Sequence, residues 1–272
     1  AGYLQHLFKL GVKTLNSNHN MAITIIPKEK QGSGAFNGGE IVENKPIGFP
    51  QDHSSVRPYS NLFYWAHARA VTDSTIGLHP HQGFEICSFV LAGEIRHYDT
   101  KLREWRPLRA GDVQIIRAGN GISHSEFMAK DAEIFQIWFD PDLTKTLEKP
   151  ASYDDYRGAD FPVKTESGVT VTTLAGPGSP FRMDTPGVEV MRLALNGNPY
   201  LLHADPAKIY SAYVLQGEVT FNGQPAKQFD FALLTEQKEI EIRAAEGAQV
   251  FLISSPANPG YRTYSQLRRA GA

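Results

Sequence analysis

Two short segments of the chain carry histidine and glutamate at alternating positions: His79 and His81 in the first, His124 and Glu126 in the second. Residues i and i+2 of a β-strand point to the same face, so each pair shares a face if its segment is a strand. Two such strands facing each other in a small barrel would bring three imidazoles and a carboxylate together. This ligand set suits Fe(II), Mn, Ni, Cu or Zn and leaves coordination positions open for water, substrate or O2. The pairing therefore predicts a metal site.

Glu85 leaves one ambiguity in this ligand set. It has the same parity as His79 and His81, so it could replace Glu126 as the carboxylate ligand. It could instead accept a hydrogen bond from a ligand imidazole, which is a common way of orienting metal-bound histidines. The spacing alone does not separate these alternatives.

The remaining histidines lack such a partner motif. His67 and His97 lie in strand-like runs and are expected to be structural, with His97 close enough to the motif to support the ligands. Three glycines flank the motif segments and are expected to allow turns or close backbone approach: Gly83, Gly119 and Gly121.

The elements that would position these residues are short β-strands. Runs rich in β-branched and aromatic residues are divided by turn-forming residues, and the chain contains 24 Gly and 17 Pro. Long helical periodicity is nearly absent. The pattern predicts an all-β fold, a sandwich or a barrel. The clearest runs are 86–91, 113–116, 134–139, 169–174, 188–193 and 250–253.

An internal repeat indicates two related halves. Residues 89–95 (FVLAGEI) resemble residues 213–219 (YVLQGEV), and at the same offset His79 falls on His203. A period this long is typical of duplicated domains rather than a solenoid. We expect an N-terminal domain at residues 21–141 with the metal site, a connection at 142–159 with one helical turn, and a C-terminal domain at 160–272. Residues 1–20 are interpreted as a loosely ordered extension.

Composition excludes several classes of protein. The formal net charge is -2, which argues against direct nucleic-acid binding driven by phosphate neutralisation. No run of 18 apolar residues occurs, so we expect no membrane span. Cys87 is the single cysteine, which favours a reducing compartment such as the cytoplasm and a role as a small buried hydrophobe.

The two motif segments resemble the pirin family of the cupin superfamily. The run His79-Pro-His-Gln-Gly-Phe-Glu85 is similar to the first pirin motif, and Gly111-Asp-Val-Gln followed by residues 118–126 is similar to the second. The Gln136-Ile-Trp138 run is similar to the next strand of the family. The resemblance spans most of residues 21–140 and weakens after residue 160.

This resemblance implies a bicupin fold, two packed cupin β-barrels with a metal in the N-terminal one. The family's ligands fall on His79, His81, His124 and Glu126, which moves Glu85 to a supporting role or to the wall of the pocket. The second half keeps His203 and Asp205 but lacks a His-x-Glu pair, so its barrel is expected to be metal-free.

The resemblance also implies two alternative functions. Bacterial pirins act as quercetin 2,3-dioxygenases, which predicts a flavonol-like substrate, O2, and Fe(II) as the metal, with Mn, Ni, Cu, Zn or Co as other suitable ions. Glu126 would act as the general base for the flavonol hydroxyl. Four aromatic residues could flank a flat substrate: Phe84, Phe127, Phe135 and Trp138. The animal pirin is an iron-dependent nuclear coregulator, which predicts a redox-sensitive regulatory protein with a protein partner.

Overall fold

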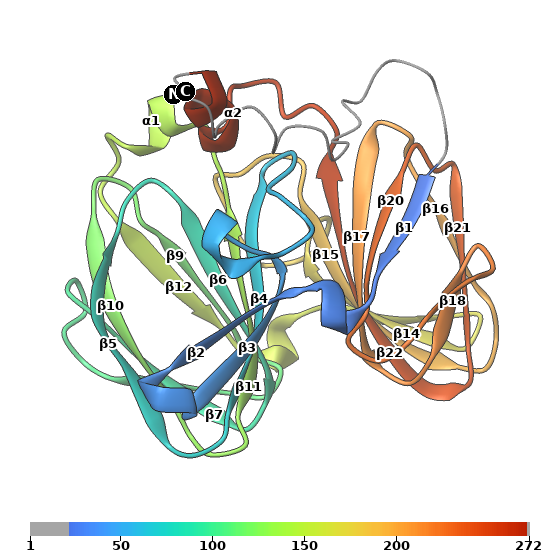
Figure 1. Cartoon of the computed structure of the whole chain (residues 1–272), viewed down its shortest axis with the longest axis horizontal. Helices are drawn as coiled ribbons and strands as arrows, with labels where there is room; N and C mark the ends of the chain where they lie inside the picture. Colours follow the sequence, from blue (N-terminus) through green and yellow to red (C-terminus); the bar gives the residue numbers. More distant parts are fainter. Residues whose placement is uncertain (1–21, 271–272) are drawn as a thin grey trace, which may run out of the picture.

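The protein consists of two halves of antiparallel β-structure lying side by side (Figure 1). The structure, a computed structural model, describes residues 22–270; the predicted extension at residues 1–20 lies outside this range. Each half contains a seven-stranded and a four-stranded sheet. The all-β, bicupin prediction is therefore confirmed.

The first half carries the motif segments. Its seven-stranded sheet has the order β12 (Ser152–Tyr156), β9 (Val113–Arg117), β6 (Glu85–Ala92), β11 (Glu133–Phe139), β4 (Leu62–Ala70), β3 (Ile41–Ile47) and β2 (Gly32–Phe36). Its four-stranded sheet has the order β5 (Ser74–His81), β10 (Ile122–Met128), β7 (Glu94–Asp99) and β8 (Arg106–Arg109).

The second half repeats this arrangement. Its seven-stranded sheet has the order β1 (Ala22–Ile26), β20 (Phe231–Thr235), β17 (Lys208–Gln216), β22 (Glu246–Pro256), β15 (Glu189–Asn196), β14 (Val169–Ala175) and β13 (Val163–Glu166). Its four-stranded sheet has the order β16 (Tyr200–His203), β21 (Glu239–Ala244), β18 (Val219–Phe221) and β19 (Gln224–Ala226).

The sequence repeat corresponds to one turn that occurs in both halves. Gly93 follows β6 and Gly217 follows β17, with φ angles of 72° and 80°. A Cβ atom at Gly93 would lie 2.8 Å from the Cα of Ala132, and one at Gly217 would lie 3.3 Å from the Cα of Ala248. Glycine is needed at both positions because the backbone is left-handed and a neighbouring strand passes close by.

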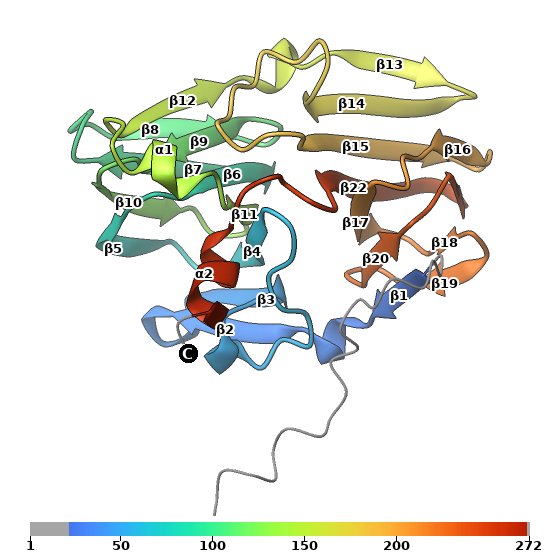
Figure 2. The same ribbon diagram turned by 90° about the horizontal axis from the view of Figure 1, so that it is seen from above.

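Two edge strands cross the boundaries expected from the sequence. β1 was assigned to the N-terminal domain, but it pairs with β20 of the second half. β12 was placed in the connection, but it pairs with β9 of the first half. Each half thus receives an edge strand from outside its own continuous segment, as Figure 2 shows for β1 beside β20 and β12 beside β9. The backbone N–H and C=O groups of an open sheet edge can pair with any strand that reaches them. Sequence order does not determine which strand that is.

The halves share one apolar core between their seven-stranded sheets. Phe135 of β11 packs against Tyr213 and Phe251, with ring centroids 4.9 Å and 5.0 Å apart. Cys87 is fully buried in the same core and burial raises the pKa of its thiol, which confirms its expected role as a small hydrophobe.

The interiors of the two barrels differ in polarity. The second is filled by a single cluster of buried apolar residues from nine of its strands, among them Val171, Phe221 and Ile242. In the first, an apolar cluster that includes Met128 and Ile134 fills only part of the space, and buried polar residues occupy the rest. Among the described residues, the first barrel therefore differs from the second in the buried polar side chains of its interior.

Two helices lie beside the first half (Figures 1 and 2). α1 (Leu143–Thr146) is the helical turn expected in the connection, and α2 (Tyr264–Ala270) returns from the second half. Short 3-10 turns occur at Lys28–Lys30, Asn37–Gly39, Pro50–Asp52 and Gly158–Asp160. No helix within residues 22–270 is long and apolar enough to cross a membrane.

Candidate metal centre

A bulge in β5 places His79 and His81 inside the first barrel. His79 lies opposite His124 of β10, but Glu126 lies opposite Ile76, so β5 contains one extra residue between these pairs. Ser74 and Ile76 face inward before the bulge, and His79 and His81 face inward after it; Leu78 between them is 57% exposed. Gly77 at this point is the sequence signal for a bulge, and our sequence reading missed it.

Pro80 fits this position because β5 is an edge strand. The strand has a neighbour, β10, on one side only in its sheet. Proline lacks an N–H and is tolerated at edges, where one side of the strand makes no ladder bonds. Pro80 therefore stiffens the segment between the two histidines without breaking the sheet.

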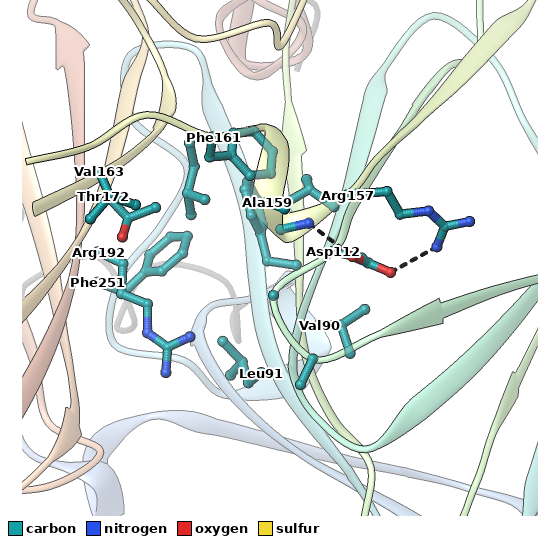
Figure 3. Close-up of a pocket in the computed structure, with 16 residues that line it drawn as sticks. Val90, Leu91, Asp112, Arg157, Ala159, Phe161, Val163, Thr172, Arg192 and Phe251 are labelled. Carbon is teal, nitrogen blue, oxygen red and sulfur yellow. Dashed lines mark hydrogen bonds and ion pairs between the residues drawn. The ribbon is translucent and has the colours of Figure 1, made fainter.

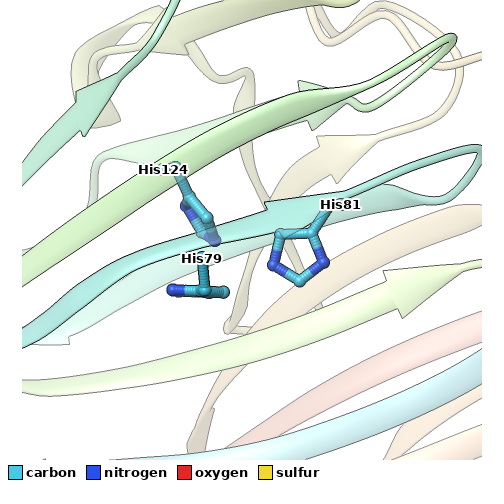
Figure 4. Close-up of side chains that lie close together, drawn as sticks. All are labelled: His79, His81 and His124. Atoms are coloured by element: carbon cyan, nitrogen blue, oxygen red, sulfur yellow. The ribbon is translucent and has the colours of Figure 1, made fainter.

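Three imidazoles meet at the centre of this arrangement (Figure 4). The ring centroids are 4.9 Å apart for His79 and His81, 4.4 Å for His79 and His124, and 4.8 Å for His81 and His124. One nitrogen from each ring can be chosen so that all three lie within 4.8 Å of one another. His124 is buried and the other two are half-buried, so the cluster is open on the β5 side.

The nitrogens of this cluster lack the partners that buried polar atoms need. Both ring nitrogens of His124 and Nε2 of His81 are buried and have no hydrogen bond within the described part of the chain. Burial and the neighbouring imidazoles lower the pKa of His81 to about 3 and that of His124 to about 2. Neutral imidazoles with free lone pairs are the form that coordinates metals. The three residues therefore fit a divalent metal ion.

A backbone carbonyl orients the third imidazole. Nδ1 of His79 lies 2.7 Å from the carbonyl oxygen of Gly77, the bulge residue. Only a protonated Nδ1 can donate to a carbonyl, so Nε2 is the nitrogen that keeps a lone pair. Metal-bound histidines commonly have this second bond.

Glu126 lies in the same barrel but outside the group of three. It is 2% exposed, and its two oxygens accept bonds from Ser88 Oγ at 3.2 Å and Gln136 Nε2 at 2.8 Å. A carboxylate has about four acceptor positions, so these two bonds leave capacity for a metal or a proton. Gln136 is in turn bonded by the indole N–H of Trp138 at 3.4 Å.

His97 and Asp99 form a buried pair beside the cluster. His97 Nε2 lies 2.8 Å from Asp99 Oδ2, and neither side chain is exposed. On the neighbouring strand, His97 lies opposite Glu126 and Asp99 lies opposite His124. The His97 ring is 5.7 Å from that of His124. The pair therefore lies beside the candidate ligand strand β10 in the same sheet.

Glu85 has none of the roles at the metal site that the sequence suggested. Its carboxylate accepts bonds from the backbone N–H groups of Asp184 and Thr185, at 2.6 Å and 2.8 Å, and from the Thr185 hydroxyl. The interpretations as a metal ligand, an acceptor for a ligand imidazole or a wall of the metal pocket are wrong. Glu85 begins β6, which belongs to the other sheet, so its shared parity with His81 has no geometric meaning across the intervening turn.

The glycines beside the motif behave as expected. All three have positive φ angles: 79° at Gly83, 49° at Gly119 and 133° at Gly121. A Cβ atom at Gly119 would lie 2.4 Å from the carbonyl oxygen of Lys149, so the segment that follows α1 passes very close to this loop.

Of the four aromatic candidates, two lie near the cluster. Trp138 packs edge-on against His81 with centroids 4.9 Å apart, and Phe84 lies 6.1 Å from Trp138. Phe135 belongs to the core between the halves, and Phe127 lies on the opposite face of β10 from the ligands with Arg96 over its ring. These two assignments were wrong because strand parity sends them to other faces.

The aromatic group around Trp138 contains residues that the sequence did not indicate. Phe49, Phe63, Tyr64 and Tyr264 pack with Phe84 and Trp138 in one cluster. They come from three separate segments, including helix α2 near the C-terminus, so no local spacing could have revealed them.

The second half has no equivalent of this cluster at the matching strands. His203 lies opposite Glu239, but its side chain is 83% exposed. Ile240 and Ile242 of β21 face the barrel interior instead. The alignment of His203 with His79 is therefore not a trace of a ligand position, because a difference of one residue in register turns a side chain to the other face.

The fold and the histidine cluster define the protein as a bicupin with a candidate metal centre in its first barrel. Comparison with known sequences leads to one family. The family model described as "Pirin" matches residues 45–139. A pirin-like protein of Caulobacter vibrioides is 31% identical over 186 residues, which cover 65% of this chain and 75% of the relative. The chain belongs to the pirin family.

Two further relatives bear on function. A quercetin 2,3-dioxygenase of Escherichia coli K12 is 28% identical over 208 residues, covering 72% of this chain and 85% of the relative. Among solved structures, the bacterial pirin YhhW from Escherichia coli in complex with nickel(II) has a TM-score of 0.73 at 24% identity, covering 86% of this chain and 99% of that chain. At this identity, the structural likeness shows the fold alone.

Proposed function

We propose that this protein is a metal-dependent dioxygenase of the quercetin 2,3-dioxygenase type, which uses Fe(II) to open the ring of a flavonol-like substrate with O2. The observation that carries the proposal is the convergence of three imidazoles, of which His81 and His124 have buried nitrogens without hydrogen-bond partners in the described part of the chain. The relative in Escherichia coli K12 that bears the name quercetin 2,3-dioxygenase supports the choice of reaction.

The ligand set proposed here is His79, His81, His124 and Glu126. A divalent ion held by these residues would act as a Lewis acid toward the flavonol hydroxyl. The carboxylate of Glu126 takes the hydroxyl proton, and its bonds from Ser88 and Gln136 keep it in place while leaving acceptor positions free. The buried His97–Asp99 pair supports the strand that carries both His124 and Glu126.

The surroundings of the cluster suit a flat aromatic substrate. The indole of Trp138 stands against His81, and the half-buried ring of Phe84 lies beyond it. Aromatic side chains bind planar rings through stacked and edge-to-face contacts. His79 and His81 at the edge strand give the substrate and O2 access from solvent.

The first experiment tests the metal site. His81→Ala is expected to lower the metal content of purified protein by at least about tenfold, because it removes one of three imidazole ligands. His203→Ala is the matched control, since it removes an exposed histidine of the second half and should leave the metal content unchanged. Equal metal content in His81→Ala and the parent protein would contradict the assignment of His81 as a metal ligand.

The second experiment tests the reaction. Protein loaded with Fe(II) should consume quercetin and O2 in equal amounts, and loading with Mn, Ni, Cu, Zn or Co identifies the ions that also support turnover. Glu126→Gln should keep the metal and lose about 10²–10⁴ in rate, the range for a general base. Iron-loaded protein that consumes neither quercetin nor O2 would exclude the dioxygenase and favour the alternative, a redox-sensitive regulatory protein with a protein partner. A cytoplasmic location remains a prediction from cysteine usage.

A further inference from the structure

A cavity lies between the two halves (Figure 3), and none of the three clustered histidines lines it. Its volume is about 470 Å³, which is in the range of small-molecule sites. Strands β6 and β9 and the loop before β9 form one wall, and β14, β15 and β22 form the other. The segment around Gly158 closes one side. Because both halves contribute, the cavity exists only in the assembled chain.

Arg192 is the charged residue on the wall from the second half. It lies between Thr172 of β14 and Phe251 of β22 in the sheet. Its Nη2 donates to Gln249 Oε1 at 2.6 Å. Its Nε and Nη1 have no partner within residues 22–270, yet neither is sealed from solvent. These donors therefore remain available to a ligand.

No acidic side chain balances this guanidinium. None of the ion pairs within the described residues includes Arg192. Burial lowers the pKa of Arg192, with no nearby carboxylate acting in the opposite direction. A partly buried cation that bonds only to a neutral amide lacks a compensating negative charge, and an anionic ligand would supply it.

The carboxylate on the opposite wall is already satisfied. Asp112 accepts bonds from Arg157 Nη1 at 2.9 Å and from the backbone N–H groups of Arg109 and Gly158, each at 2.9 Å. It therefore does not compete for Arg192, and Figure 3 shows it directed toward Arg157. The two arginines and one aspartate leave the cavity with one net positive charge.

The rest of the lining is apolar and partly aromatic. The floor is formed by Phe89, Phe161, Leu174 and Phe251, which belong to the core between the halves. Phe89 and Phe251 meet edge to face with centroids 5.1 Å apart. A ligand for this cavity needs an anionic end for Arg192 and an apolar ring system for the floor.

We propose that this cavity binds an aromatic monocarboxylate, with Arg192 receiving the carboxylate and the phenylalanine floor receiving the ring. A guanidinium binds a carboxylate with two parallel hydrogen bonds through Nη2 together with Nε or Nη1. Gln249 accepts only one of the two hydrogens of Arg192 Nη2, so one such pair of donors remains open. A single arginine balances one negative charge, which favours a monoanion over a phosphate ester. The site is separate from the histidine cluster and stands whether or not the protein is a dioxygenase.

The test compares 2-naphthoate with its uncharged analogue 2-naphthalenemethanol by isothermal titration calorimetry on the full chain. The parent protein should bind 2-naphthoate at least about tenfold more tightly than the alcohol. Arg192→Gln should remove this preference, and Arg192→Lys should retain part of it because it keeps the charge without the fork. Arg96→Gln, which changes an exposed arginine paired with Glu94, should have no effect.

A further variant separates this site from the metal centre. Because carboxylates also bind metals, the titrations are repeated with His81→Ala, which should leave 2-naphthoate binding unchanged. Equal affinity for acid and alcohol, or an unchanged preference in Arg192→Gln, would overturn the proposal. Loss of binding in His81→Ala together with its retention in Arg192→Gln would assign the ligand to the metal centre instead.

Discussion

The carbonyl oxygen of Gly77 decides which nitrogen of His79 faces the other two imidazoles. Its bond to Nδ1 directs Nε2 toward the cluster, and burial keeps His81 and His124 neutral through lowered pKa values. The residue types and the i, i+2 spacing of the ligands were predictable, because both follow from strand geometry. The role of Gly77 was predictable only in part, because a glycine within a strand can mark a bulge but the pairing of β5 with β10 decides where the bulge forms.

Glu85 is a residue for which alternation along the sequence predicts the wrong surroundings, because it does not share a face with His79 and His81. Its three bonds join the start of β6 to the segment at Asp184 and Thr185, one hundred residues later in the chain. We predict that Glu85→Ala lowers the free energy of unfolding by about 3 kcal/mol, since it leaves buried N–H groups without acceptors. Urea denaturation measures this loss.

The metal content of Glu85→Ala distinguishes a structural role of Glu85 from a role as a metal ligand. It should equal that of the parent protein, because the carboxylate is committed elsewhere. Glu246→Ala, at an exposed position, is the control and should change stability by no more than about 0.5 kcal/mol. A variant that keeps its stability but loses its metal would restore Glu85 to the ligand set.

At the scale of elements, helix α2 depends on a buried carboxylate from the first half. Asp140 is 2% exposed; its Oδ2 accepts a bond from the Tyr264 N–H at 2.8 Å, and its backbone carbonyl accepts one from the Tyr261 hydroxyl at 2.6 Å. Tyr264 in turn packs against Phe63 and Phe84 beside the cluster. The C-terminal segment therefore contributes to the surroundings of the metal centre.

This attachment should depend on pH. Burial raises the pKa of Asp140 to about 7, above the usual value of 3.8. The folded protein therefore binds more protons than the unfolded chain between about pH 4 and 7, and the contribution of Asp140 to stability decreases as pH rises through this range. Asp140→Asn cannot titrate, so its stability relative to the parent should rise between pH 5 and 8 by at least about 1.4 kcal/mol.

Urea denaturation at several pH values checks this expectation. Asp142→Asn is the control, because bonds from Thr144 and Lys145 already hold the pKa of Asp142 below its usual range. Its stability relative to the parent should not change between pH 5 and 8. A constant difference for Asp140→Asn over the same range would show that Asp140 is ionised throughout.

At the scale of the whole molecule, the two halves form one structural unit. They share the core around Phe135, and the N-terminal strand β1 pairs with the sheet of the second half. We predict that Phe135→Ala destabilises the protein by about 3–5 kcal/mol, since it creates a cavity between the two seven-stranded sheets. Both halves should still unfold in a single transition.

Two spectroscopic probes distinguish the halves. The tryptophans Trp65, Trp105 and Trp138 all belong to the first half, and Trp65 also packs against Phe231 and Phe251 of the second. Their fluorescence therefore reports on the first half and the shared core, while far-ultraviolet circular dichroism reports on strands of both halves. The two unfolding curves should coincide. Phe127→Ala, on an outer face, is the control with an expected loss of about 1 kcal/mol. Separate transitions in the parent protein would show that the halves fold independently.

The amino-acid sequence by itself determined the strand-rich fold, the duplication and the alternating His and Glu pairs of the candidate site, while the choice of Glu126 over Glu85 came from the family resemblance. These follow from local patterns: β-branched runs, a recurring Gly-Glu turn, and alternation of side chains along a strand. Tertiary structure decided which alternating residues face the same space. Strand pairing produces the bulge at Gly77 and leaves His203 exposed. The tertiary structure also bonds Glu85 to a distant segment and packs Phe135 in the core between the halves. The physical reason is that sheet register and edge pairing are set by contacts between strands far apart in the chain, and a shift of one residue reverses the face of every side chain.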